Sequence, residues 1–127
     1  MQAPFNDRAI QKARLSSVKA WIEEHLSDPT LTLEKVAKSN QISLRQLHYL
    51  FDLCATTPSE WIWQRRLQRS YELLAGDRTG LSVTDVAFRH GFSSSSHFST
   101  LFRRSFGLRP SEVKRSGHLP EKGCEPA

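Results

Sequence analysis

Three positions in one segment, Arg45, His48 and Tyr49, carry side chains that can recognise the edges of nucleic-acid bases. Their spacing of three and four residues places them on one face of a helix. The apolar residues of the same segment fall on the opposite face and would be buried: Leu47, Leu50 and Phe51. An arginine in the first turn of such a helix can form two hydrogen bonds with a guanine edge. The pattern favours a base-reading face, and a merely solvated face is the alternative.

A second polar set lies about 50 residues further along the chain and consists of Ser95, Ser96, Ser99 and Thr100. Hydroxyl groups are short, and they both donate and accept hydrogen bonds, so they discriminate poorly between bases. We expect this set to contact bases but to contribute positioning more than specificity. The alternative is that these residues only cap and solvate their helix.

Contacts to backbone phosphates have two kinds of candidates. Helices that begin at Thr32 and Ser82 would offer free N–H groups to a phosphate. The positively charged candidates are Arg65, Arg66 and Arg69 in one segment, Arg103 and Arg104 in another, and Lys114 and Arg115 near the end. We expect only some of these arginines to contact nucleic acid, because charged residues of a helix usually just face water.

Both polar sets belong to a pattern that occurs twice. Leu31-Thr32-Leu33 and Val36-Ala37 reappear 50 residues later as Leu81-Ser82-Val83 and Val86-Ala87. The offset grows to 51 between Phe51 and Phe102 and to 52 between Pro58 and Pro110. Insertions are tolerated in turns and not inside packed helices, so a pattern that shifts only at its turns indicates a structural repeat. Two such units predict a monomer that reads two half-sites.

Apolar periodicity and capping residues predict an all-α fold of about seven helices. The first helix covers 9–26 and ends before Pro29. Short helices follow, capped by Thr32 and then by Ser43, and the steep crossing of two helices so close in sequence is typical of a helix-turn-helix. The end of this apolar stripe includes Cys54, which we expect to be a small buried residue. A long helix then starts after Thr57 and ends at Gly76.

The second unit repeats this order. Its first helix starts after Ser82, carries Val83, Val86, Ala87 and Phe88, and ends at Gly91. The next begins within Ser93–Ser96 and ends at Gly107, and Pro110 starts the last one. The predicted organisation is a linker or lead-in over 1–8, a first helix-turn-helix subdomain over 9–57, a linking helix over 58–75, a second subdomain over 76–116 and a disordered tail over 117–127.

Composition limits the function classes further. With 127 residues, of which 38% are hydrophobic, the chain can form one compact domain or two small lobes. The net charge of +5 favours a polyanionic partner. The apolar runs are shorter than the roughly 18 residues of a membrane span, and the N-terminus lacks a signal-peptide core, so we expect a cytoplasmic protein without membrane contact. Cys54 and Cys124 fit no metal-ligand spacing, and we expect neither a metal nor a cofactor.

The second unit also carries a recognisable set of short motifs. They are Asp85-Val86-Ala87, Gly91-Phe92-Ser93, Ser96-His97-Phe98-Ser99, Leu101-Phe102-Arg103-Arg104, Phe106-Gly107 and Arg109-Pro110-Ser111. The set resembles the signature of the AraC/XylS family DNA-binding domain, and the resemblance extends over residues 9–116. It implies a bacterial transcription regulator, an activator in contact with RNA polymerase, that binds double-stranded DNA with two helix-turn-helix units in adjacent major grooves. It also implies that the positions of Arg45, His48 and Tyr49 touch bases.

Two positions depart from the family pattern. Thr100 stands where family members commonly have an arginine, which agrees with weak base reading by the second unit. Gln41 stands where a turn glycine is common. A left-handed backbone at glutamine costs about 1 kcal/mol or more, so we expect the first turn to differ in shape from the second.

Other readings stay open on the sequence. A helical adaptor could use the same surfaces for a protein partner, and the serine-rich helix of the second unit favours it. An enzyme is disfavoured, because the sequence has no nucleophile–base pair, glycine-rich phosphate loop or metal-ligand cluster. We expect an isolated monomeric domain, either the C-terminal piece of a longer regulator, which the linker-like residues 1–8 favour, or a short stand-alone regulator.

Overall fold

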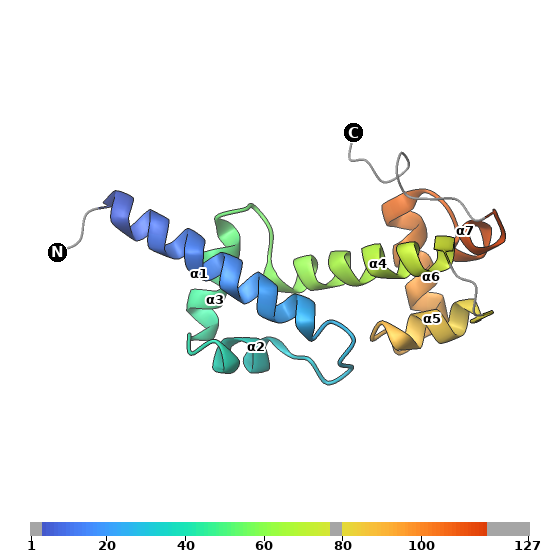
Figure 1. Cartoon of the computed structure of the whole chain (residues 1–127), viewed down its shortest axis with the longest axis horizontal. Coiled ribbons are helices and arrows are strands. Elements are labelled where there is room, and N and C mark those ends of the chain that lie inside the picture. Colours follow the sequence, from blue (N-terminus) through green and yellow to red (C-terminus); the bar gives the residue numbers. More distant parts are fainter. Residues whose placement is uncertain (1–3, 77–79, 117–127) are drawn as a thin grey trace. The chain divides into compact units, whose positions relative to one another are not determined.

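The computed structural model describes residues 4–76 and 80–116, with side chains from Arg8 to Gly76 and from Gly80 to Lys114. Within these ranges the chain forms seven helices and no strand, as predicted for an all-α fold (Figure 1). The described residues divide into two compact units. The first holds the residues up to Leu26 and Thr30–Trp63, and the second holds Ser27–Pro29 and the residues from Gln64 onward.

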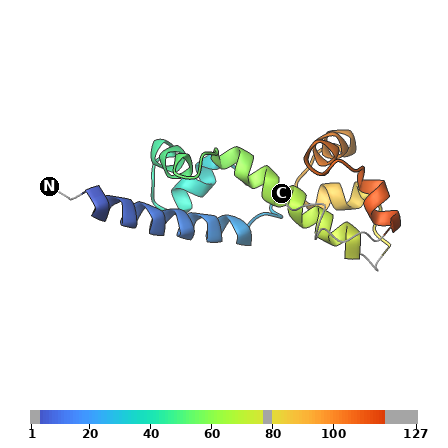
Figure 2. The same ribbon diagram turned by 90° about the horizontal axis from the view of Figure 1, so that it is seen from above.

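The first unit is built from α1 (Pro4–Glu24), α2 (Leu33–Ser39) and α3 (Leu44–Asp52), each packed on the other two (Figures 1 and 2). The predicted apolar stripes meet in its core, where Ile22, Val36, Leu47, Leu50 and Phe51 are fully buried. Trp61, from the start of the long helix, packs against this core and lies 5.8 Å from the Phe51 ring.

The first helix begins earlier than predicted, at Pro4 rather than near residue 9. Proline suits the first turn of a helix because its missing N–H would have no partner there. The first described side chains of α1, from Arg8 to Ile10, are exposed. The described side chains at this end of α1 therefore bury no apolar stripe, which is why periodicity did not reveal the earlier start.

The long helix α4 (Pro58–Gly76) starts where Thr57 predicts, because the Thr57 hydroxyl accepts a hydrogen bond from the Glu60 N–H at 3.1 Å. Its residues up to Trp63 belong to the first unit and those from Gln64 belong to the second. At 1.5 Å per residue its 19 residues span about 28 Å.

The second unit contains α5 (Val83–Arg89), α6 (Ser95–Phe106) and α7 (Pro110–Ser116), which also pack on one another. Its core is largely aromatic: the Tyr71 ring stacks on Phe102 at 5.6 Å, and Phe98 lies 4.9 Å from Phe92. Tyr71 is 1% exposed, which supports a core role for this aromatic residue. Two apolar expectations fail, because Phe88 is 53% exposed and Cys54 is exposed beyond the end of α3.

Some predictions fall outside the described residues. These are the lead-in at 1–3, the turn over 77–79, the tail over 117–127 and the side chain of Arg115.

Candidate nucleic-acid interface

The turns of the two helix-turn-helix units have the same hydrogen bonds. In the first, the Ile42 N–H donates to the Ala37 carbonyl at 3.0 Å, and in the second the Phe92 N–H donates to the Ala87 carbonyl at 3.0 Å. In each unit a side chain hydrogen-bonds to the carbonyl of the buried valine in the helix before the turn, Val36 of α2 and Val86 of α5. Asn40 Nδ2 donates to the Val36 carbonyl at 2.7 Å, and His90 Nδ1 lies 2.8 Å from the Val86 carbonyl. The repeat seen in the sequence is therefore a repeat of backbone geometry.

Gln41 takes the left-handed conformation that glycine takes in the second turn. Its φ is 58°, and the φ of Gly91 is 86°. The expectation that the first turn differs in shape is wrong, because Gln41 tolerates the strained backbone while all the turn hydrogen bonds are kept. A second pair of equivalent positions is also left-handed in both units. Ala55 after α3 has a φ of 56°, and Gly107 after α6 has a φ of 75°.

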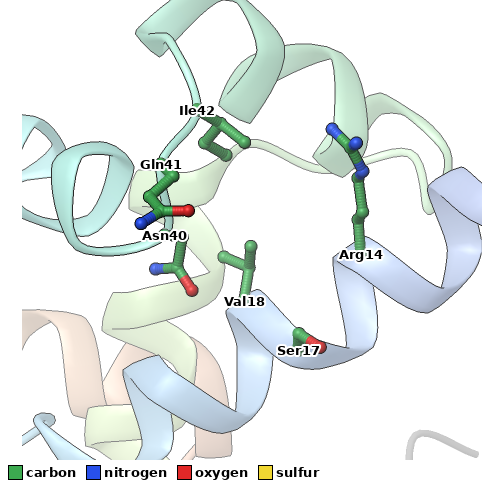
Figure 3. A pocket seen from close by; sticks show the side chains of 6 residues that line it. All are labelled: Arg14, Ser17, Val18, Asn40, Gln41 and Ile42. Atoms are coloured by element: carbon green, nitrogen blue, oxygen red, sulfur yellow. The ribbon is translucent and has the colours of Figure 1, made fainter.

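A hollow of about 270 Å³ adjoins the first turn. Arg14, Ser17 and Val18 of α1 face Asn40, Gln41 and Ile42 of the turn across it (Figure 3). Gln41 is exposed and lines this hollow, so its side chain is accessible to solvent at this left-handed position.

The predicted reading face of α3 is on the surface. Arg45, His48 and Tyr49 are exposed, and Tyr49 is 52% exposed although tyrosine is largely apolar. Leu47, Leu50 and Phe51 are fully buried on the other side. The Ser43 hydroxyl caps the helix by accepting from the Gln46 N–H at 3.0 Å, so Arg45 sits in the first turn as predicted. The structure thus brings the three side chains together on one accessible face.

The corresponding face of α6 is partly buried and partly exposed. Ser96 and Thr100 are exposed and Ser95 and Ser99 are half-buried. The Ser95 hydroxyl lies 3.4 Å from the Thr84 hydroxyl of α5. The cap of the helix is Ser94, which accepts from the His97 N–H at 3.1 Å, so none of the four candidates is needed as a cap.

The candidate phosphate residues differ in what they offer. Thr32 caps α2 by accepting from the Lys35 N–H, and Ser82 forms a full capping box with Asp85 on α5. Arg103 and Arg104 are exposed in the last turns of α6, and Arg65 is half-buried on α4.

Arg66 does not fit a surface phosphate contact. It is 4% exposed, and its Nη2 donates to the Asp28 carbonyl at 3.0 Å. Its guanidinium also packs against Gly91, where an added Cβ would lie 2.8 Å from Arg66 Cζ. Burial lowers the pKa of Arg66, and the Asp28 charge opposes this shift. Arg66 is therefore a structural residue of the second unit, and this corrects the prediction that it contacts phosphate.

Sequence reasoning missed Arg109. It lines a hollow of about 250 Å³ in the second unit together with the predicted residues Ser99, Thr100 and Arg103. The signal in the sequence was an arginine directly before Pro110, the first residue of α7. The position of Arg109 in this hollow depends on how α7 packs beside α6, and the local sequence pattern does not predict that packing.

His90 is 8% exposed, whereas His97 is exposed with its ring 6.2 Å from Phe92. Burial lowers the pKa of His90, the hydrogen bond to the Val86 carbonyl raises it, and the charges of Arg69, Arg89 and Arg66 lower it further. His90 is therefore neutral at pH 7, with its proton on Nδ1 facing the carbonyl.

Among the described residues, no helix has the length and hydropathy of a membrane span, and no three His, Cys, Asp or Glu side chains are grouped as metal ligands would be.

The sequence of this chain is similar to those of known helix-turn-helix proteins. A family model described as "Helix-turn-helix domain" matches residues 36–116, which include the second helix-turn-helix unit and part of the first. The "HTH-type transcriptional activator RhaS" of Escherichia coli O139:H28 (strain E24377A / ETEC) is 40% identical over 110 residues. The chain belongs to the AraC/XylS family. The match covers 84% of this chain and 38% of the RhaS protein, so the AraC/XylS domain spans less than two-fifths of that relative.

Solved structures are similar to this AraC/XylS domain in fold and in sequence. A "transcriptional regulator (AraC-type DNA-binding domain-containing proteins)" from Chromobacterium violaceum matches with a TM-score of 0.77 and 30% identity, over 88% of this chain and 98% of that one. The "DNA-binding domain of AdpA, the global transcriptional factor, in complex with a target DNA" matches with a TM-score of 0.70 and 29% identity, over 80% and 90% of the two chains.

Proposed function

We propose that this domain binds double-stranded DNA sequence-specifically, with α3 and α6 in adjacent major grooves, and thereby regulates transcription. The observation that carries the proposal is the doubled helix-turn-helix, in which each second helix presents polar side chains on its accessible face. A helix of this kind fits the major groove, where every base pair has its own pattern of donors and acceptors. AdpA, a structural relative, is described in complex with a target DNA.

Arg45, His48 and Tyr49 supply most of the base recognition in this proposal. The planar guanidinium of Arg45 pairs with the O6 and N7 atoms of a guanine, which no other base matches. The hydroxyls of Ser95, Ser96, Ser99 and Thr100 make shorter and less selective contacts in the second groove.

Backbone phosphates are held by residues that flank these helices. The candidates are Thr32 and Ser82 at the starts of α2 and α5, Arg65 on α4, and Arg103 and Arg104 on α6. Each neutralised phosphate releases condensed counterions, so binding weakens as salt rises.

The continuous helix α4 supports the reading of two half-sites by one monomer. Two recognition helices read the same side of DNA when they are about one helical turn, roughly 34 Å, apart. A single helix that contributes residues to both units is the kind of connection that can set such a register on DNA, whereas a flexible linker would not.

Activation through contact with RNA polymerase is a further part of the proposal, as is action in the bacterial cytoplasm. The RhaS relative is named a transcriptional activator. The exposed Phe88 on α5, at 53% of its surface, favours a protein contact of this kind, because large aromatic side chains are common in interfaces. A pure protein adaptor would use the same surface without DNA.

Equilibrium titration against a panel of unrelated duplexes tests the proposal. We expect affinities that differ by at least about a thousandfold between the best duplex and random ones, and that fall steeply as salt increases from 50 to 200 mM. Equal affinity for all duplexes would overturn sequence-specific binding. Salt-insensitive capture of a protein partner without DNA affinity would establish the adaptor instead.

A further inference from the structure

The second unit has a hollow of about 250 Å³ where α5, α6 and the start of α7 meet. Two arginines line it, Arg103 from α6 and Arg109 from the segment before α7. Three hydroxyl side chains and two apolar residues complete the lining: Ser99, Thr100 and Ser111, with Val83 and Pro110. Arg103 and Arg109 are both exposed, so their guanidinium groups are accessible to a ligand.

This lining has the chemistry of an oxyanion site. Each guanidinium offers several N–H donors in a fixed plane that matches two oxygens of a phosphate, and hydroxyls can donate to the remaining oxygens. Among the residues that the structure describes, no acidic side chain lines the hollow. The nearby Glu112 carboxylate accepts a hydrogen bond from the Arg109 backbone N–H at 2.8 Å, where it caps α7.

The first unit lacks the charged part of this arrangement. By the repeat offsets, Asp52 corresponds to Arg103 and Thr57 corresponds to Arg109. At the start of α4 the Thr57 hydroxyl accepts from the Glu60 N–H, whereas at the start of α7 the Glu112 carboxylate accepts from the Arg109 N–H. Two arginines in place of an aspartate and a threonine make this point of the second unit three charge units more positive, beside the poorly selective hydroxyls of α6.

We propose that Arg103 and Arg109 together hold one backbone phosphate of DNA, with the hydroxyls of Ser99 and Ser111 as further donors. The inference rests on the proposed DNA binding, because Ser99 and Thr100 belong both to this hollow and to the predicted reading face of α6. The arginine pair compensates for the weak base reading of α6 by adding affinity that does not depend on sequence.

Replacement of Arg109 tests the arginine pair. Arg109→Ala should weaken binding to the preferred duplex and to random duplexes alike, by about tenfold at low salt. The slope of log affinity against log salt should fall, by less than the roughly 0.9 of a whole phosphate contact, because Arg103 still contacts the phosphate. Arg109→Lys should keep the slope and lose part of the affinity, because lysine keeps the charge but not the planar fork.

The matched control is Arg8→Ala, which removes an exposed arginine of α1 that lines neither hollow. It should leave affinity and slope unchanged. If Arg109→Ala behaves like Arg8→Ala while the wild-type protein binds DNA, the arginine pair is refuted and the proposed function stands.

Failure of the proposed function looks different, because the wild-type protein would then bind no duplex. In that case the pair of arginines could bind a free phosphate instead, and inorganic phosphate added at constant ionic strength tests this. A rise in melting temperature with phosphate that Arg109→Ala abolishes would show a site for a free oxyanion and would overturn its assignment to DNA.

Discussion

At the scale of single residues, Arg66 and Gly91 restrict each other. The buried guanidinium occupies the space where a Cβ of residue 91 would lie, and the hydrogen bond to the Asp28 carbonyl holds it there. The equivalent residue of the first turn is Gln41, which borders an open hollow. Glycine at 91 is therefore required by a neighbouring side chain as well as by its backbone conformation.

Gly91→Ala should lower the free energy of unfolding by about 2–4 kcal/mol, because alanine adds both left-handed strain and overlap with Arg66. Gly107→Ala is the matched control, since its φ of 75° is similar and nothing lies within 4 Å of the added Cβ. It should cost only about 1–2 kcal/mol. Equal losses for the two variants in urea unfolding would contradict the packing explanation.

Arg45→Ala should weaken binding to the preferred duplex by about 1–3 kcal/mol and relax the preference at one base pair. The reason is that a bidentate contact to guanine disappears while the phosphate contacts remain. Arg104→Ala serves as a comparison and should weaken all duplexes alike. An equal loss on every duplex for Arg45→Ala, measured by titration, would make Arg45 a phosphate contact.

His90 makes the stability of the second unit depend on pH. Its pKa is lowered in the folded protein, so the unfolded chain takes up a proton first as pH falls below about 6.5. The stabilisation is fully present above that pH and is lost as pH falls toward the lowered pKa, by at most about 1.4 kcal/mol per pH unit. His90→Asn imitates Asn40 of the first unit, whose amide makes the same hydrogen bond without titrating.

The difference in unfolding free energy between wild type and His90→Asn should therefore change between pH 7 and pH 5, with the wild type losing more. A difference that stays constant over this range would exclude His90 as the titrating group.

At the scale of elements, the capped helices were the most predictable. Thr32, Ser43 and Ser82 mark the starts of α2, α3 and α5 as their sequence signals indicate, because a cap is a local interaction within four residues. The start of α1 was not predicted, because the sequence there gives neither a capping signal nor a recurring apolar pattern. Helix boundaries are thus predictable from local sequence where a side chain caps the helix.

The surface positions of the candidate reading residues on α3 were also predictable, because they depend on a local pattern. Arg45, His48 and Tyr49 follow from the apolar stripe on the other face of α3. Arg66 was misassigned because its burial depends on Asp28, 38 residues earlier in the chain. Arg109 was missed for a related reason, since its neighbours come from α5 and α6.

Gln41→Gly should raise the free energy of unfolding by about 0.5–1 kcal/mol, because glycine removes the left-handed strain of the first turn. The gain is smaller than the strain itself, because glycine also raises the conformational entropy of the unfolded chain. The turn hydrogen bonds stay the same, so DNA affinity should not change. Urea unfolding checks the first expectation and duplex titration the second. A loss of stability would mean that the Gln41 side chain contributes a contact that outweighs its backbone strain.

At the scale of the whole molecule, the chain contains a duplicated unit whose copies differ in the chemistry of their exposed side chains. The first copy carries arginine and aromatic groups suited to base edges, and the second carries hydroxyls and an arginine pair suited to the backbone. We propose that the first unit selects the sequence and the second contributes mainly affinity, with both bound to one DNA molecule.

Selection from a pool of randomised duplexes at near-physiological salt, followed by sequencing of the bound fraction, distinguishes the two units. We expect a strongly enriched block that Arg45→Ala relaxes, and a weaker enriched block about one helical turn, roughly 10 base pairs, away. Binding without any enriched block, or no binding at all, would contradict this expectation.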